Sequence, residues 1–178
     1  LQEFFRALDS SMLNNHDEAA MAKARELGKK VYIYNQGQSR YSFGLYQWSE
    51  RAKGVSGRYQ WIAFIRHGYE YFDLDGREPD TGVIFYSSDG LRSTPALERA
   101  SEGMNDLRYL QTLENLAARA EQDDAGEARQ AAAEARAFLK RVADSIAINQ
   151  RQQPAGLDPD AVRREAAERI LGLLKLAK

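Results

Sequence analysis

The stretch from Lys30 to Ile65, KVYIYNQGQSRYSFGLYQWSERAKGVSGRYQWIAFI, decides the expected fold. Its first residues, Lys30–Asn35, are β-branched and aromatic, which predicts a short strand. A helical stretch follows from about Arg40 to Lys53 and ends at a glycine. A second strand is expected at about Arg58–Ile65. Its nearly continuous apolar character is typical of a strand buried on both sides in a parallel sheet.

The alternation of helices and strands also includes the residues before this stretch, and it ends after Ile65. Asn15 and Glu18 have the spacing of a capping box, which opens a helix that runs through Leu27. The order helix, strand, helix, strand with short loops predicts right-handed βαβ units and a parallel sheet wrapped by helices. Residues 66–80 then form a long polar and aromatic loop, and residues 82–86 a short strand. Long irregular segments of this kind commonly carry function.

The second half of the chain has a different composition. All aromatic residues but Phe138 lie at or before Tyr109. The later residues are dominated by Ala, Glu, Arg and Leu, which is typical of helices packed on one another. Helix starts are predicted at Thr94–Pro95, at the capping box of Asp124 and Glu127, and at Asp158–Pro159. Buried faces are predicted at Leu107, Leu110, Leu113 and Leu116, and at Ala135, Phe138, Leu139 and Val142. We therefore expect two parts, residues 1–93 and residues 94–178.

Composition excludes several classes of protein. The chain has 178 residues, a formal net charge of −1, 43% hydrophobic and 29% charged residues, as in a soluble globular domain. No apolar run approaches the roughly 20 residues that span a bilayer, and a near-neutral chain is not a general nucleic-acid binder. The absence of cysteine excludes disulfides, thiolate metal sites and cysteine nucleophiles. It leaves a secreted or periplasmic location open, and we expect no cofactor.

Two segments carry a resemblance to a known family. Residues 31–64, VYIYNQGQSRYSFGLYQWSERAKGVSGRYQWIAF, contain a strand ending in aromatic-Asn, an Arg shortly before Phe-Gly, and Gly-x-x-Gly before a Trp-centred strand. Residues 94–116, TPALERASEGMNDLRYLQTLENL, contain Glu-x(3)-Glu-Gly-x(2)-Asp-x(2)-Tyr-Leu. In order and spacing, these elements resemble the carboxy-terminal part of the catalytic domain in proteins of the glycoside hydrolase family 123 type, also described as domain of unknown function 4091. The resemblance spans about half of the chain.

This resemblance implies an α/β fold, the carboxy-terminal fragment of a (β/α)8 TIM-like barrel followed by a helical bundle. It implies hydrolysis of N-acetylhexosaminides, in which the acetamido oxygen of the substrate attacks the anomeric carbon, a Glu is the general acid and the preceding Asp orients the acetamido group. The only Asp-Glu dipeptide here, Asp17-Glu18, falls in the first turn of a predicted helix, where the helix dipole favours acids.

A whole barrel needs roughly 250 residues. We therefore expect the catalytic pair upstream of Leu1 and expect the chain to be inactive alone. Its expected partners are carbohydrate and either the missing amino-terminal part of the barrel or a second copy of the chain.

The candidate substrate-binding residues follow the two predicted strands, because chemistry in such barrels lies at the carboxyl ends of strands. Tyr34 and Asn35 end the first strand, and their phenol and amide can hydrogen-bond sugar hydroxyls; for Asn35, fixing the loop is the alternative. Trp61 offers a flat face to a pyranose or is buried in the core. Arg40 anchors a ligand oxygen or a loop carboxylate.

The long loop adds further candidates. His67 directly follows the second strand and is the candidate catalytic residue, since an ordinary histidine pKa near about 6.5 suits proton transfer. Tyr69, Tyr71, Asp73 and Asp75 combine aromatic faces with carboxylate acceptors, which is typical of a sugar subsite. The two aspartates also hint at calcium, but the further ligands of an EF-hand loop are missing, so we predict no metal site.

Other charged residues are expected to be structural. Glu98, Glu102, Asp106 and Arg108 are at helical spacing and predict ion pairs that dock the helix, with catalysis as the alternative. His16 is expected at the surface. The sequence thus predicts the carboxy-terminal portion of a glycoside-hydrolase-like protein; the alternative is a non-catalytic carbohydrate-binding or structural interaction module.

Overall fold

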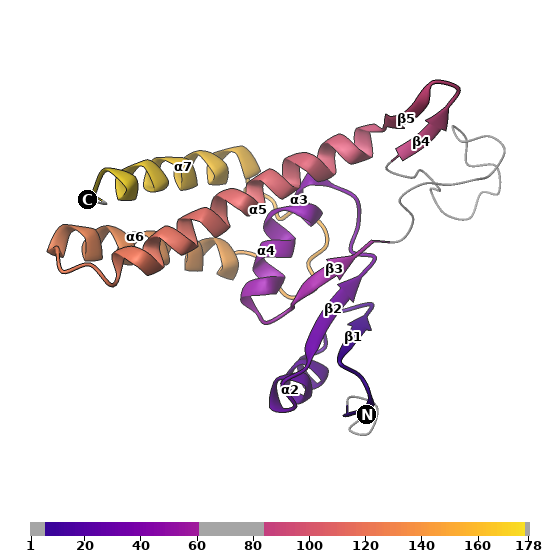
Figure 1. Cartoon of the computed structure of the whole chain (residues 1–178), viewed down its shortest axis with the longest axis horizontal. Coiled ribbons are helices and arrows are strands. Elements are labelled where there is room, and N and C mark those ends of the chain that lie inside the picture. Colours follow the sequence, from indigo (N-terminus) through magenta and orange to yellow (C-terminus); the bar gives the residue numbers. More distant parts are fainter. Residues whose placement is uncertain (1–5, 61–83, 177–178) are drawn as a thin grey trace.

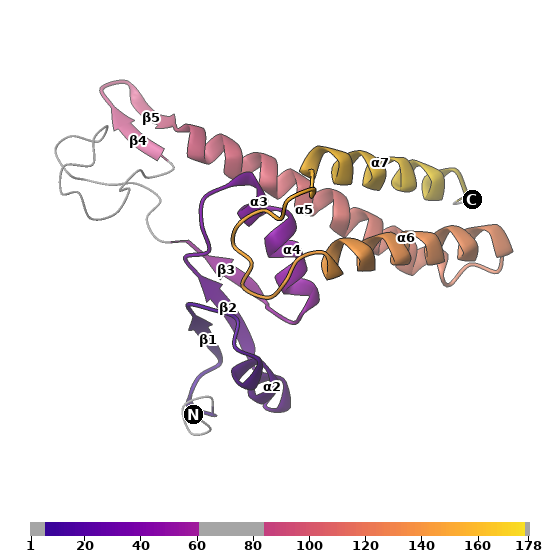
Figure 2. The ribbon, with the colours of Figure 1, turned by 180° about the vertical axis from the view of Figure 1, so that it is seen from behind.

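The computed structural model describes residues 6–60 and 84–176 (Figure 1). The first range contains β1 (Ser10–Leu13), α2 (Glu18–Glu26), β2 (Lys30–Tyr34), α3 (Arg40–Phe43), α4 (Leu45–Ala52) and β3 (Gly57–Tyr59). The second contains β4 (Ile84–Ser87), β5 (Gly90–Ser93), α5 (Pro95–Ala120), α6 (Gly126–Asp144) and α7 (Pro159–Leu176). In Figures 1 and 2, α4 lies between the sheet and α5, and α6 and α7 lie beside α5.

The sheet has the order β1-β2-β3, and both pairs of neighbours are parallel. This confirms the predicted parallel pairing of the strand at Lys30–Asn35 with the one that begins near Arg58. Strand β1 was not predicted. Val31 and Ile33 of β2 are buried against the helices. On the opposite face, Met12 and Tyr59 are each 54% exposed, so the described helices cover one side of the sheet.

The expected carboxy-terminal fragment of a (β/α)8 barrel is wrong. The described residues contain one three-stranded parallel sheet and a separate antiparallel hairpin of β4 and β5, and the chain then continues into three helices. The strand predicted at residues 82–86 is the first arm of this hairpin, and its second arm was not predicted. The interpretation failed because consecutive βαβ units are shared by open sheets and barrels, so two such units do not distinguish them.

Local signals placed the first helices with small errors. Asp17, and not Asn15, caps α2, since its side chain accepts from the backbone N–H of Ala20 at 2.8 Å. The structure thus confirms that Asp17 and Glu18 lie at the start of a helix, with Asp17 as its cap. The single helix predicted over residues 40–53 is divided into α3 and α4 at Gly44, where the backbone crosses Gly103 of α5 closely.

The helices of the second half begin largely as predicted. Thr94 caps α5, and α7 starts at Pro159. Helix α6 lacks the predicted capping box, because Ala125 stands at its N-cap and the carboxylate of Asp123 accepts from that residue's N–H. The predicted faces are buried, with Leu107 and Leu116 only partly so. One hydrophobic cluster joins residues of α2, β2 and α4 to those of α5, α6 and α7.

None of the helices within the described ranges combines the length and the apolar character needed to cross a membrane.

Candidate functional site

The carboxyl ends of the parallel strands meet at one edge of the sheet, which we call the carboxyl edge. Asn14 follows β1, Asn35 follows β2 and Gln60 follows β3. Asn35 adopts a left-handed backbone with φ of 55°, and its N–H donates to the carbonyl of Tyr59 at 3.0 Å. The side-chain amide of Gln60 donates to Oδ1 of Asn35 at 3.1 Å. Asn35 therefore fixes the loop and remains exposed at the edge.

Gln36 is the buried centre of this edge, and none of its side-chain surface is exposed. Its Nε2 donates to the carbonyls of Asn14 at 2.6 Å and Tyr34 at 2.5 Å. Its Oε1 accepts from the hydroxyl of Tyr46 at 2.9 Å and from Nε of Arg151 at 3.0 Å. The amide thus ties β1 and β2 to α4 and to the loop after α6. The sequence had no signal for this role, because a glutamine after a strand is usually exposed.

Two buried phenols lie beneath this edge. Burial raises the pKa of Tyr46 to about 12, and the nearby Glu50 carboxylate adds to the effect. Burial likewise raises the pKa of Tyr41 above its ordinary value, and the Tyr41 hydroxyl donates to the carbonyl of Gln150 at 2.9 Å. Both phenols therefore remain protonated hydrogen-bond donors at neutral pH and do not serve as bases.

Arg58 of β3 lies at the same edge and is partly buried. Its guanidinium donates to the carbonyls of Ser42 and Gly37, each at 2.7 Å, and also to Oε1 of Gln60. It stacks over the ring of Phe43, 4.0 Å from the centroid. Burial lowers the pKa of Arg58 to about 10 because the charged form is desolvated.

His16 is not a surface residue, contrary to the prediction. Its side chain and that of Glu50 are both completely buried, and Nδ1 of His16 lies 2.6 Å from Oε2 of Glu50. Asn149 completes the cluster: its N–H donates to Oε1 of Glu50 at 3.0 Å, and its side chain makes two hydrogen bonds with the backbone of His16. The cluster joins the end of β1 to α4 and to the loop after α6. Its full burial leaves no access for a substrate.

Arg40 makes carboxylate contacts within the fold. Its Nε donates to Oδ2 of Asp106 at 2.7 Å, and its NH2 lies 2.8 Å from Oδ1 of Asp160. The hydrogen bond to Asp106 is the largest cause that raises the pKa of Arg40 above its ordinary value. Asp106 is 1% exposed and also accepts from Nε of Arg163 at 2.6 Å. Asp106 therefore joins α3, α5 and α7, as expected of a docking ion pair.

The remaining predicted candidates lie outside the described residues. These are Trp61, His67, Tyr69, Tyr71, Asp73 and Asp75. Tyr34 is partly buried and lies beside Asn35 at the edge. The edge therefore brings together Tyr34, Asn35 and Gln60, while Arg40 points its charge toward α5 and α7.

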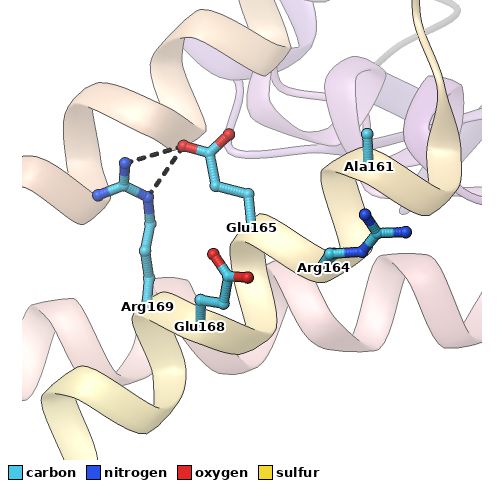
Figure 3. Close-up of a pocket in the computed structure, with 5 residues that line it drawn as sticks. All are labelled: Ala161, Arg164, Glu165, Glu168 and Arg169. Carbon is cyan, nitrogen blue, oxygen red and sulfur yellow. Dashed lines mark hydrogen bonds and ion pairs between the residues drawn. The ribbon is translucent and has the colours of Figure 1, made fainter.

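A shallow hollow lies on the surface of α7 (Figure 3). It is lined by Ala161, Arg164, Glu165, Glu168 and Arg169, all from one helix. Glu165 is engaged there by Arg169 and by Arg141 of α6, each at 2.8 Å. Such exposed ion pairs hold helices together weakly and leave no converging group for a ligand. Across the described ranges, no group of three or more His, Asp or Glu side chains is arranged to hold a metal ion.

The chain was compared with known families, curated proteins and solved structures. None of the three comparisons gave a match.

Proposed function

We propose that the carboxyl edge binds carbohydrate, and that the chain is the carboxy-terminal portion of a glycosidase-like protein. The observation that carries the proposal is the meeting of Tyr34, Asn35 and Gln60 where two neighbouring parallel strands end. In open α/β sheets, ligands bind outside the carboxyl ends of the strands. The motif resemblance in residues 31–64 and 94–116 supports the same class of ligand.

The chemistry of the edge suits a sugar. Each sugar hydroxyl both donates and accepts, and amide side chains offer both functions. Asn35 uses Oδ1 for Gln60, and its Nδ2 makes no hydrogen bond with the described residues, so that group is free to donate. Beside it, Tyr59 is 54% exposed and its ring lies 5.2 Å from that of Tyr32. Exposed aromatic faces pack against the C–H face of a pyranose.

The proposed parent reaction is substrate-assisted hydrolysis of N-acetylhexosaminides, and we propose that the acid, the Glu of an Asp-Glu pair, does not belong to this chain. Within the described residues, the buried or engaged carboxylates do not fit the role. Asp17 caps α2, and Glu50 is wholly buried against His16. This chain would then supply the binding wall alone.

A non-catalytic module is the second candidate function. The exposed face of the sheet, with Met12 and Tyr59 each 54% exposed, favours contact with another molecule without chemistry. Turnover by the whole parent protein separates the two candidates, since only a glycosidase-like parent that contains the acid would release product; the 178-residue chain is expected to be inactive under both.

The binding proposal is tested on the 178-residue chain with chitotetraose by isothermal titration calorimetry. Asn35→Gly is the sharp variant, because glycine tolerates the φ of 55° while the amide is removed. We expect affinity to fall roughly tenfold, the worth of one or two hydrogen bonds. Asn105→Ala, which removes an amide of α5, is the control and should bind as the wild type does. Equal binding by Asn35→Gly, or no binding by the wild type, contradicts the proposal.

Catalysis is tested separately with a chromogenic N-acetylhexosaminide. We expect no turnover by the 178-residue chain. Measurable hydrolysis that survives purification would show that the acid lies within this chain and that its placement here is wrong.

A further inference from the structure

We infer that the ligand of the carboxyl edge carries an anionic group, a carboxylate or a sulfate, which Arg58 and Arg151 receive. The inference rests on the proposed function, because it concerns the charge of a ligand bound at the same edge. Among the described residues, the positive charges at this edge have no negative partner.

Arg58 differs from the other partly buried arginines of the described residues. The other five have a carboxylate oxygen at 2.6 to 2.8 Å from a guanidinium nitrogen; they are Arg40, Arg51, Arg136, Arg163 and Arg169. Arg58 has none among the described residues. Within residues 6–60 and 84–176, a carboxylate thus lies beside every partly buried guanidinium except that of Arg58.

The contacts of Arg58 hold its position without neutralising its charge. Its acceptors are the carbonyls of Ser42 and Gly37 and the amide oxygen of Gln60, all neutral. Its Nε is buried and makes no hydrogen bond within the described residues. The ring of Phe43 gives some compensation. A partly buried cation without an anion is costly for a fold, and the lowered pKa of Arg58 has the same cause, desolvation.

Arg151 is a second cation at this edge and is exposed. It too donates to neutral acceptors: Oε1 of Gln36 at 3.0 Å, the carbonyl of Asn14 at 2.7 Å, and the side chain of Asn15. Arg151 binds the side chain of Gln36, and Arg58 binds the carbonyl of the next residue, Gly37. The two guanidinium groups therefore contact adjacent residues, Gln36 and Gly37, directly after β2.

The nearby acids are committed elsewhere. Asp17 caps α2, Glu18 lies 3.5 Å from the buried His16, and Glu50 is sealed beneath the edge. The described part of the edge thus offers amides and two cations. Guanidinium groups bind carboxylate and sulfate oxygens with charge-assisted hydrogen bonds, while the amides suit the hydroxyls of the same sugar. A glycan that carries uronate or sulfate groups beside N-acetylhexosamine has this combination.

The experiment compares three oligosaccharides on the 178-residue chain by calorimetry: neutral chitotetraose, a hyaluronan tetrasaccharide that carries uronates, and a sulfated chondroitin tetrasaccharide. We expect the anionic ligands to bind roughly tenfold or more tightly than chitotetraose, and the advantage to shrink with added salt. Arg58→Gln and Arg151→Gln should each remove the advantage, so that the anionic oligosaccharides bind no more tightly than chitotetraose does to the same variant. Arg51→Gln, which loses an ion pair to Glu114 instead, is the matched control and should keep it.

Each outcome decides a different claim. Equal affinity for all three oligosaccharides, unchanged in Arg151→Gln, overturns the anionic ligand and leaves carbohydrate binding standing. A preference for sulfate over uronate, or the reverse, identifies the group. If no oligosaccharide binds, the proposed function fails. The anion site is then tested by itself: sodium sulfate is titrated into the protein, and the side-chain ¹⁵Nε resonances of Arg58 and Arg151 are followed by NMR. Resonance shifts that Arg58→Gln abolishes would keep the anion site, and their absence in the wild type would refute it.

Discussion

The close crossing of Gly103 of α5 with the junction of α3 and α4 gives the sharpest stability prediction. A Cβ added at Gly103 would lie 2.3 Å from the carbonyl oxygen of Arg40, 2.8 Å from Cβ of Phe43 and 2.9 Å from the nitrogen of Gly44. Real Cβ atoms essentially never come within 3.0 Å of such neighbours, and two of these three atoms belong to the backbone. Gly103→Ala must therefore move α5 away from the junction of α3 and α4.

The size of the effect follows from three contributions. Overpacking against backbone belongs at the top of the ~1–3 kcal/mol range. The move also loosens the ion pair of Arg40 with Asp106, one turn along α5, which adds ~1–2 kcal/mol. The better helix propensity of alanine returns about 1 kcal/mol. The expected net loss is about 3 kcal/mol, a fall in Tm of roughly 6–12 °C for a chain of this length.

The assay is thermal and urea unfolding followed by circular dichroism, with Gly172→Ala as the matched control. Gly172 lies in α7 with no atom within 4 Å of an added Cβ, so alanine there should raise stability by about 0.5–1 kcal/mol. If Gly103→Ala is as stable as the wild type, or gains stability as Gly172→Ala does, the close crossing of α5 with Gly44 is wrong.

Three further predictions concern polar side chains that are buried or hydrogen-bonded to buried residues. Asp106→Asn should lower the free energy of unfolding, measured with urea, by about 3 kcal/mol, because it removes the buried anion between two arginines. Asp160→Asn, whose carboxylate is 65% exposed, should lower it by less than about 1 kcal/mol, and equal losses would contradict the docking role of Asp106. Asn149→Gly should lower the free energy of unfolding by about 1–2 kcal/mol, because two hydrogen bonds to His16 are lost. Asn149→Ala should lower it by about 1 kcal/mol more, because φ at this position is 60°, and an alanine variant more stable than the glycine variant would refute that conformation. Since burial raises the pKa of Tyr46 from 10.0 to about 12, its contribution to stability is fully present below pH 10 and is lost as the pH rises toward 12. Tyr46→Phe should reduce the fall in unfolding free energy between pH 10 and pH 12, and the same fall in the variant and the wild type would contradict the raised pKa.

The sequence predicted those elements whose signals are local. The β-branched run of β2, the Thr94-Pro95 start of α5 and the Asp158-Pro159 start of α7 each lie within a few residues, and the structure confirms them. Strand β1, of only four residues, was missed because SSML has neither alternation nor β-branched residues. The break at Gly44 was missed because its cause is Gly103, on another helix.

For the candidate site, too, the sequence placed residues that have a local signal and misplaced residues whose partners are distant in the chain. Tyr34 and Asn35 were placed at the carboxyl end of a strand because that strand is recognisable, and their role in binding stays a prediction. The contacts of Arg40 depend on Asp106, 66 residues away. His16 was placed at the surface because its partners, Glu50 and Asn149, are 34 and 133 residues distant. A buried polar residue is identified by its partners, and no local pattern names them.

The loop between α6 and α7 shows why the carboxyl edge depends on the helical half of the chain. Three consecutive residues of this loop reach the sheet region: Asn149 binds His16 and Glu50, the carbonyl of Gln150 accepts from Tyr41, and Arg151 binds Gln36. Each contact satisfies a buried polar group, and an unsatisfied one costs ~1–3 kcal/mol. The helices therefore do more than cover a core. By fixing the two ends of this loop they hold Arg151 against Gln36, so that the proposed binding edge at the end of β2 requires a residue 115 positions after Gln36.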